Sequence, residues 1–185
     1  PPVLSFQQQR RKMMTGTFNT GETRESLRKE YNPDGSVLRQ AQLRLLDMLD
    51  YLKEAAAEAG VTWRLDGGNV LGALRHGGFI PWDDDVDIVV DHKDYGRFCT
   101  YLKRHPHPQY VLQDNSTDPG YLKPWASLRD TKSEHISTEK ENSRDRKALE
   151  SMKYRGLHID IFPYEDRILP RLQRLAGKLA CVVNF

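Results

Sequence analysis

The clearest pattern along the chain is an apolar stripe between residues 37 and 59. Its members recur every three or four positions, the spacing of one face of an α-helix: Val37, Ala41, Leu45, Met48, Leu49, Leu52, Ala56 and Ala59. Ser36 is suited to cap the start of this helix, and Gly60 is suited to end it. We therefore expect one long amphipathic helix whose apolar side packs on a core.

Shorter patterns surround this helix. Runs rich in β-branched residues, or alternating between apolar and polar residues, predict strands over residues 61–65, 86–90, 110–113, 124–129 and 156–162. Helical spacing predicts further helices over residues 69–76, about 93–104, and 168 to the end. This mixture favours an α+β fold, with a mixed β-sheet flanked by helices.

The two ends of the chain differ from its centre. Residues 1–30 are polar, and we expect an N-terminal arm or short strands there, before a turn at residues 32–36. Residues 31–185 are expected to form the domain. We expect it to be truncated at its C-terminus, because an apolar periodic segment is still running at Phe185. The charged residues 131–152 have almost no core positions and are a candidate loop or lid.

Composition narrows the class of protein. The chain has 185 residues, 38% hydrophobic and 29% charged, with a net charge of +2, which indicates a globular domain and gives no electrostatic case for nucleic-acid binding. Cys99 and Cys181 belong to no CxxC pair, so we expect reduced thiols and a cytoplasmic setting. No apolar run approaches the ~20 residues of a membrane span. Peripheral contact through the amphipathic terminal segment is the alternative to its packing on the domain.

Four aspartates within five positions carry the strongest chemical signal. Asp85 and Asp87 are two positions apart at a predicted strand, so their side chains share one face and can converge on Mg2+ or Mn2+. Asp83 has the same parity and is a further candidate ligand, whereas Asp84 has the opposite parity. A solvated acidic turn is the alternative reading. The apolar residues from Val86 onward favour a rigid metal site, because they draw the segment into a sheet.

A glycine pair precedes these acids. Gly67 and Gly68 follow a predicted strand and precede a predicted helix that starts at Asn69. Free backbone N–H groups at such a helix start bind anions, so Gly67, Gly68 and Asn69 are candidate phosphate-binding residues. A plain tight turn is the alternative, and the nearby acids are what favour the phosphate site.

A third carboxylate and several cations complete the candidate set. Asp160 lies in an apolar alternating strand, where it could bind the metal or take a proton from an attacking hydroxyl; an ordinary outward-facing polar residue is the alternative. The candidate phosphate contacts are Arg75, His76, Lys123 and Arg129. For Arg75, Lys123 and Arg129, each taken alone, an ordinary surface charge is the favoured alternative. For His76, a surface or capping role is as well supported as contact with a ligand. No zinc, P-loop, Rossmann or hydrolase-triad motif is present.

The stretch DGGNVLGALRHGGFIPWDDDVDI resembles the signature of the LicD family of phosphocholine transferases, which includes fukutin and fukutin-related protein. YNPDGSVLRQAQLRLLDMLDYL, KPWASLRD and HIDIFPYED resemble its leading helix, middle strand and later acidic strand. The resemblance covers roughly residues 31–170. It implies a nucleotidyltransferase-like fold, metal ligands at Asp85 and Asp87, and a phosphate-contacting turn at Gly67 and Gly68. It also makes Asp160 the third acid, as ligand or general base.

The resemblance also implies an activity. Members of this family move a phosphorylated alcohol from a CDP-activated donor to a glycan hydroxyl, commonly phosphocholine onto lipopolysaccharide or teichoic acid. We therefore expect CDP-choline as the first donor to consider, and a glycan or lipid-linked glycan as acceptor. Two rivals remain. One is a nucleotidyltransferase that places a nucleoside monophosphate on an alcohol, and the other is an inactive nucleotide-binding or scaffold domain.

Overall fold

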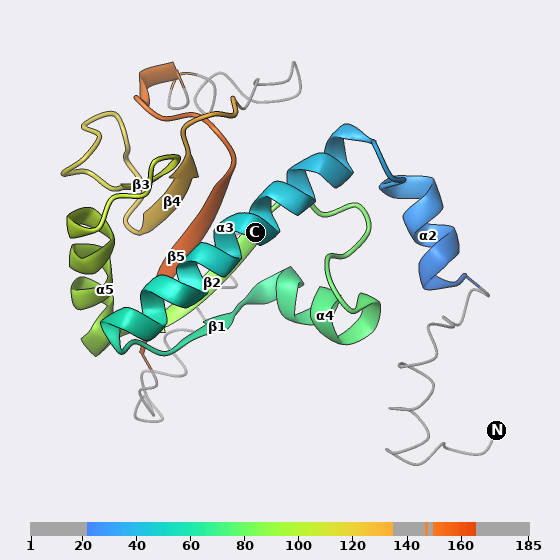
Figure 1. Cartoon of the computed structure of the whole chain (residues 1–185), viewed down its shortest axis with the longest axis horizontal. Coiled ribbons are helices and arrows are strands. Elements are labelled where there is room, and N and C mark those ends of the chain that lie inside the picture. Colours follow the sequence, from blue (N-terminus) through green and yellow to red (C-terminus); the bar gives the residue numbers. More distant parts are fainter. Residues whose placement is uncertain (1–21, 135–146, 148–149, 166–185) are drawn as a thin grey trace, which may run out of the picture.

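The computed structural model describes residues 22–134, 147 and 150–165 (Figure 1). Its helices are α2 (Arg24–Tyr31), α3 (Val37–Ala59), α4 (Gly67–His76) and α5 (His92–Arg104). Its strands are β1 (Trp63–Leu65), β2 (Val86–Asp91), β3 (Tyr110–Gln113), β4 (Ala126–Asp130) and β5 (His158–Tyr164). The expected α+β fold, with a mixed sheet flanked by helices, is confirmed.

The strands form one five-stranded sheet in the order β1-β2-β5-β4-β3. β2 and β5 run parallel, and the other neighbouring pairs are antiparallel. β5 follows the other four strands in the sequence but lies between β2 and β4. The β1–β2 and β3–β4 pairs are therefore joined into one sheet only when β5 pairs with both.

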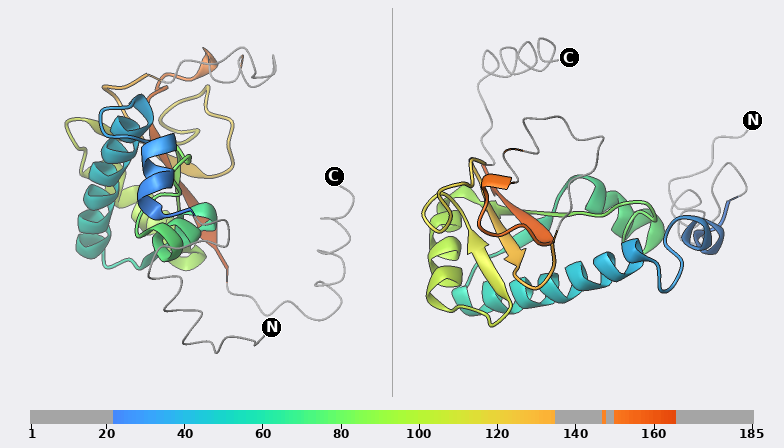
Figure 2. Two further views of the ribbon diagram at one scale, coloured as in Figure 1. Left: turned by 90° about the vertical axis from the view of Figure 1, so that its right-hand side faces the viewer. Right: turned by 90° about the horizontal axis from the view of Figure 1, so that it is seen from above.

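One face of the sheet carries the hydrophobic core. Along β2, Val86, Ile88 and Val90 are buried and alternate with more accessible residues. They pack in one cluster with Leu45 and Met48 of α3 and with apolar residues of α5. Figures 1 and 2 show α3 and α5 lying across the sheet on this side. The alternate residues of each strand consequently point to the opposite face.

The long helix follows its sequence pattern. Ser36 caps α3, with its Oγ accepting a hydrogen bond from the Arg39 backbone N–H at 3.1 Å. Gly60 ends α3 in the left-handed conformation, with φ of 62°. Both expected ends of this helix are therefore confirmed.

Two helices differ from expectation. α4 begins at Gly67 instead of Asn69, because the glycine pair forms its first turn and Asp66 occupies the N-cap position. α2 replaces the arm or short strands that we expected for the residues before the turn. Thr23 forms a capping box with Ser26, and Leu27 is buried, so this segment has both a start signal and an apolar anchor.

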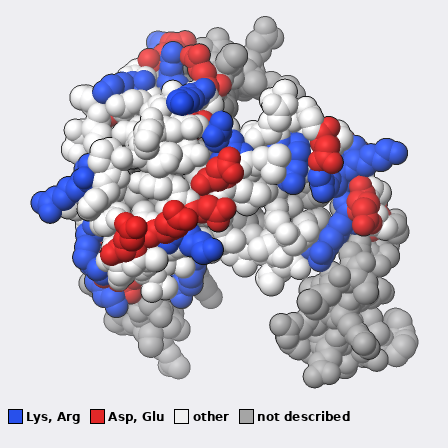
Figure 3. Space-filling view, in the orientation of Figure 1, with Lys and Arg blue, Asp and Glu red and all other residues white. Residues whose placement is uncertain are grey.

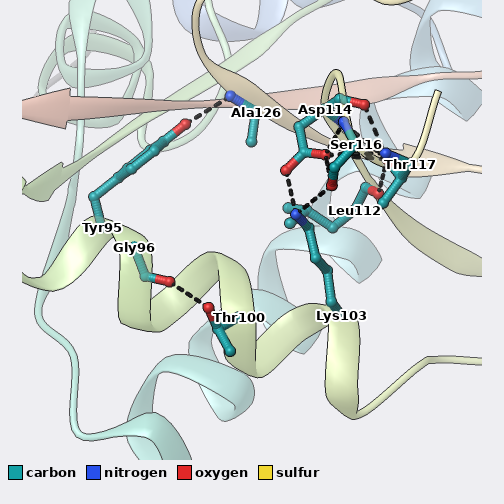
Figure 4. Close-up of polar contacts among 9 residues, drawn as sticks. All are labelled: Tyr95, Gly96, Thr100, Lys103, Leu112, Asp114, Ser116, Thr117 and Ala126. Atoms are coloured by element: carbon teal, nitrogen blue, oxygen red, sulfur yellow. Dashed lines mark hydrogen bonds and ion pairs between the residues drawn. The ribbon is translucent and has the colours of Figure 1, made fainter. Parts of the chain in front are cut away.

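α5 also fixes the start of β4 and the loop after β3 (Figure 4). The Tyr95 hydroxyl accepts a hydrogen bond from the Ala126 backbone N–H at 2.7 Å. Lys103 lies 2.5 Å from an Asp114 carboxylate oxygen and donates to the Ser116 hydroxyl at 2.7 Å. These contacts tie β4 and the end of β3 to a helix of the core, and so support the register of β4 against β5.

Some expectations cannot be compared with this structure. Residues 1–21, residues 168–185, Cys181 and most of the candidate lid at 131–152 lie outside the described residues. Cys99 is a free, buried cysteine. Among the described helices, none combines the length and the apolar character needed to cross a bilayer.

Gly72 is a position where the fold requires glycine. A Cβ at Gly72 would lie 2.5 Å from the Gly78 carbonyl oxygen and 2.8 Å from the Ile80 nitrogen, both of them backbone atoms. We expect Gly72→Ala to lower the free energy of unfolding by about 1–3 kcal/mol, because α4 must move away from its own connection to the acidic loop. Urea unfolding followed by circular dichroism measures this change.

Gly96→Ala is the matched control. Gly96 lies within α5, and a Cβ there would meet no atom within 4 Å. The same substitution should raise stability by about 0.5–1 kcal/mol, since alanine favours a helix interior. Equal effects of the two substitutions would contradict the close approach of α4 to residues 78–80.

Candidate functional site

Polar residues form a row across the sheet. Asp87 of β2 pairs with Asp160 of β5, Asp160 with Ser127 of β4, and Ser127 with Gln113 of β3. The Asp66 backbone N–H donates to the Asp87 carbonyl oxygen at 3.0 Å. Asp66 is the residue that follows β1, so the row also reaches the end of that strand. Directly paired residues carry their side chains on the same face. The row therefore lies on the face opposite α3 and α5, and brings together two of the acids predicted from the sequence.

Asn69 links the first turn of α4 to the acidic loop. Its Nδ2 donates to the Asp85 carbonyl oxygen at 3.0 Å, and its Oδ1 accepts from the Asp87 backbone N–H at 2.6 Å. The Asn69 side chain is buried and its amide is used for these two contacts. Asn69 therefore positions the acids beside the start of α4, a role that differs from the direct phosphate contact expected from the sequence.

The glycine pair lies against the same acids. Gly67 has φ of +52°, which favours glycine, and a Cβ at Gly68 would lie 3.1 Å from Asp83 Oδ2. Glycine at position 68 thus allows Asp83 to approach the first turn of α4. The Asn69 backbone N–H donates to the Asp66 carbonyl oxygen at 3.1 Å, whereas Gly67 and Gly68 occupy the first two helical positions, whose N–H groups have no intrahelical acceptor. The acids therefore adjoin a helix start that can bind an anion.

The carboxylates repel one another. The pKa of Asp87 is raised to about 6, first by burial and then by the negative charges of Asp85, Asp160 and Asp66. The pKa of Asp85 is also raised, by burial and by the charges of Asp84 and Asp160. Burial also raises the pKa of Asp83, with repulsion from its neighbours adding to the effect. A cation would relieve this repulsion and favour the ionised acids.

Asp160 behaves differently. Burial alone would raise its pKa, but the charge of His158 and hydrogen bonds from Ser127 and Lys123 hold the pKa below its usual value. Lys123 Nζ lies 2.9 Å from Asp160 Oδ2, and the Ser127 hydroxyl donates to Oδ1. Asp160 consequently stays ionised, and a carboxylate held in this state suits an electrostatic or ligand role better than proton uptake.

The donor set is compatible with a hard divalent cation. Asp83, Asp85 and Asp87 supply only carboxylate oxygens, the ligands that Mg2+ and Mn2+ prefer. Within residues 22–134, 147 and 150–165, no three His, Cys, Asp or Glu side chains are already arranged to hold an ion.

Arg129 lies inside the fold. Only 2% of the residue is exposed, its Nε donates to Gln113 Oε1 at 2.7 Å, and its Nη1 donates to the Gly156 carbonyl oxygen at 2.7 Å. Burial lowers the pKa of Arg129, although nearby acids and Tyr121 oppose this shift. These contacts give Arg129 a role in holding β3, β4 and β5 together, and its contact with phosphate stays a prediction.

Arg75 and His76 lie at the opposite end of α4 from the glycine pair. A helix of this length spans roughly 14 Å, so the two ends are distinct places. The Arg75 carbonyl oxygen accepts a hydrogen bond from Arg24 Nε at 2.8 Å, and the His76 ring lies 6.4 Å from the Trp82 ring. The structure brings Lys123 to the acids and places Arg75 and His76 in another cluster.

Sequence reasoning missed several residues of the acid site. Asp66 raises the pKa of Asp87, and Ser127 and His158 act on Asp160. The Tyr121 hydroxyl lies 2.6 Å from Ser127 Oγ and extends this network. Only the strand register aligns Ser127 with Asp160, so no local signal in the sequence could have identified it.

The raised pKa of Asp87 has a measurable consequence for stability. Between the unfolded pKa near 3.8 and the folded pKa of about 6, the folded protein keeps a proton that the unfolded chain releases. Ionised Asp87 therefore costs stability above pH 6. We expect Asp87→Asn to stabilise the metal-free protein by about 1 kcal/mol at pH 8, after allowance for solvent screening. The gain should disappear as the pH falls from 6 to below 4.

Urea unfolding in EDTA at a series of pH values measures this difference. Asp91→Asn, at the other end of β2, is the control, because its expected change in stability has the opposite sign to that of Asp87→Asn. Its carboxylate accepts a hydrogen bond from the Lys93 backbone N–H, which lowers its pKa. Asp91→Asn should therefore destabilise the protein at pH 8. A loss of stability in Asp87→Asn at pH 8 would contradict the repulsion described above.

This chain is similar to proteins of a known family. Residues 60–171 match the family described as LicD/FKTN/FKRP, nucleotidyltransferase domain. The lipopolysaccharide cholinephosphotransferase LicD of Haemophilus influenzae is 38% identical over 76 residues, which are 41% of this chain and 29% of that protein. The ribitol 5-phosphate transferases FKRP of mouse and human are each 45% identical over 53 residues, 29% of this chain and 10% of theirs. The alignments thus span less than a third of each relative. The family match covers most of the chain, which belongs to the LicD/FKTN/FKRP nucleotidyltransferase-domain family.

Proposed function

We propose that this domain is a metal-dependent phosphotransferase. It moves a phosphorylated alcohol from a CDP-activated donor to a hydroxyl of a cell-surface glycan. Phosphocholine is the first alcohol to test, because the Haemophilus influenzae relative is named as a lipopolysaccharide cholinephosphotransferase. Ribitol phosphate is the second, because the FKRP relatives are named as ribitol 5-phosphate transferases.

One observation carries the proposal: repelling carboxylates lie beside the first turn of α4. Asp87 and Asp160 are neighbours in the sheet, and the charge of Asp160 raises the pKa of both Asp85 and Asp87. Negative charge of this kind is unfavourable unless a cation offsets it. The helix start next to it favours the opposite kind of ligand, an anion such as phosphate. A cation and a phosphate held side by side are what phosphoryl transfer requires.

Each group then has a separate task. Asp85 and Asp87 would hold the divalent cation, with Asp83 and Asp160 as further candidates; when bound, Mg2+ or Mn2+ supplies a Lewis acid for the phosphate oxygens. The backbone N–H groups of Gly67 and Gly68 orient the donor phosphates. Asn69 holds α4 against the acidic loop, so that the acids stay next to these N–H groups.

Lys123 is the cation nearest to the acids. Its Nζ contacts Asp160 at 2.9 Å and lies 3.4 Å from His158 Nε2. A lysine ammonium can transfer its contact from a carboxylate to a phosphate oxygen without changing its charge. Lys123 therefore stabilises Asp160 in the absence of donor and steadies the donor phosphates once they are bound.

The test is product analysis with paired aspartate variants. The chain is incubated with CDP-choline, CDP-ribitol or CTP, with a glycan acceptor, in Mg2+ or Mn2+ or in EDTA. We expect CMP release that needs the metal and falls at least about 100-fold in Asp85→Asn and in Asp87→Asn, since each loses an anionic ligand. Asp84→Asn is the control. Asp84 is exposed in the same loop on the opposite parity, and its loss should leave most of the activity.

A binding measurement accompanies the assay. A donor at a hundred times its dissociation constant adds about 2.7 kcal/mol of stability, so a thermal-shift experiment detects it. Metal-dependent stabilisation by one CDP-alcohol in the wild type, and not in Asp85→Asn, would support the proposal. Pyrophosphate release from CTP in place of CMP release would instead support a nucleotidyltransferase. Full activity in both Asp85→Asn and Asp87→Asn would overturn the assignment of the site.

A further inference from the structure

A second cavity lies away from the acids, between α2, the start of α3 and the residues that follow α4. Its volume is about 290 Å3, close to the lower end of the range of about 300–1,000 Å3 found for small-molecule pockets. Three guanidinium groups and one imidazole are among the side chains that line it: Arg24, Arg28, Arg39 and His76. Figure 3 shows Lys and Arg side chains gathered over α2 and the adjoining end of α3.

The lining is positively charged. Glu25 is the one carboxylate in it, against three arginines. Arg28 also pairs with Asp34, and Arg24 donates to the Arg75 carbonyl oxygen, so these side chains are held in place at the cavity. Glu25 and Asp34 offset part of the charge of the three arginines, and an anion in that space would offset the rest. The cavity therefore favours an anionic ligand.

Arg39 lines the cavity with a guanidinium whose hydrogen bonds within the described residues are incomplete. Its Nε–H is buried and has no hydrogen-bond acceptor among the described residues. Its Nη1 reaches Gln42 Oε1 only at 3.4 Å. A buried donor of a charged group without an acceptor is costly. The buried Nε does not face the cavity, so an anion there would contact Arg39 through its terminal Nη groups, and a planar guanidinium is well suited to phosphate.

Two exposed aromatic rings stand beside the cavity. Tyr31 and Trp82 are 44% and 55% exposed, and their rings meet edge to face at 5.1 Å. Trp82 also lies against His76 and directly follows Pro81, and both of these residues line the cavity. Exposed aromatic side chains with one apolar face and one polar edge are typical of binding surfaces. The apolar face of a sugar ring suits such a surface.

The cavity is connected to the acidic loop through hydrogen bonds. Asn32, which lines the cavity, donates from Nδ2 to Gln42 Oε1 at 2.6 Å. Gln42 in turn donates from Nε2 to the Asp83 carbonyl oxygen at 2.8 Å. One buried amide therefore supports both the wall of the cavity and the loop that carries the acids, so the two sites have a fixed relation.

We propose that this cavity is a second binding site, which takes the phosphate group of a phosphorylated sugar. Arg24, Arg28 and Arg39 bind the phosphate, and the Tyr31–Trp82 pair receives the sugar. The phosphate belongs to the acceptor glycan, an assignment that rests on the proposed function, because the donor phosphates are assigned there to Gly67 and Gly68 at the other end of α4. Binding here does not depend on the proposed transfer reaction, because it needs neither the aspartates nor a metal ion.

Isothermal titration calorimetry of the full chain in EDTA tests this site, with glucose 6-phosphate, CMP and inorganic phosphate as probes. We expect a sugar phosphate to bind, and Arg39→Gln and Arg28→Gln each to weaken that binding at least about tenfold, the effect of one lost charge-assisted contact. Arg28 is the more exposed of the two, so its loss tests the site even if Arg39→Gln lowers stability. Arg104→Gln, an exposed arginine at the end of α5, should change nothing.

The probes distinguish a sugar phosphate from a nucleotide. Tighter binding of glucose 6-phosphate than of CMP supports the acceptor site, and the reverse order would contradict it. Trp82→Ala should weaken binding of the sugar phosphate and leave inorganic phosphate unaffected. No binding of any probe, or unchanged affinity in folded Arg28→Gln and Arg39→Gln, would overturn the proposal. Asp85→Asn should bind the probes normally, so failure of the transferase assay would leave this result intact.

Discussion

The parallel pairing of β2 with β5 is the constraint on which the rest of the structure depends. β5 comes after all the other strands, yet it lies between β2 and β4 and completes the sheet. The same register that buries Ile88 beside Ile161 sets Asp87 beside Asp160. The strand pairing that forms the core is thus the same pairing that brings the two acids together. A shift of β5 by one residue would bury its carboxylate in the core and expose its isoleucines.

The group of acids Asp83, Asp85 and Asp87 is electrostatically unfavourable within an otherwise well-packed domain. Asp87 and Asp85 gain protons more readily than free aspartates, whereas Asp160 is kept ionised by Lys123, Ser127 and His158. The site therefore contains one carboxylate, Asp160, whose charge is already stabilised by the protein. The negative charges of Asp85 and Asp87 would be stabilised by a bound cation. Such strain at a site is maintained by the surrounding fold, here by Asn69, whose amide clamps the backbone of the acidic loop.

The candidate ligand-binding cations named above lie in two separate places. Lys123 forms an ion pair with Asp160, whereas arginines of α2 and α3 line a separate cavity near the end of α4. α4 lies between the two places, with its glycine start at the acids and His76 at the cavity. A ten-residue helix that is held at one end by Asn69 and packed closely at Gly72 can keep two ligands at a fixed separation. That arrangement suits a reaction between a donor and an acceptor.

The sequence by itself located most of the helices and strands and identified the candidate acids. Periodicity located α3 with its caps at Ser36 and Gly60, and the spacing of Asp85 and Asp87 on a strand identified the acids, because these signals are local. Local signals could not align Asp160 with Asp87, recruit Ser127 and Lys123, or take Arg129 into the interior. These facts depend on which strands become neighbours. The tertiary structure alone decided them, because contacts between distant segments are set by burial of the shared core.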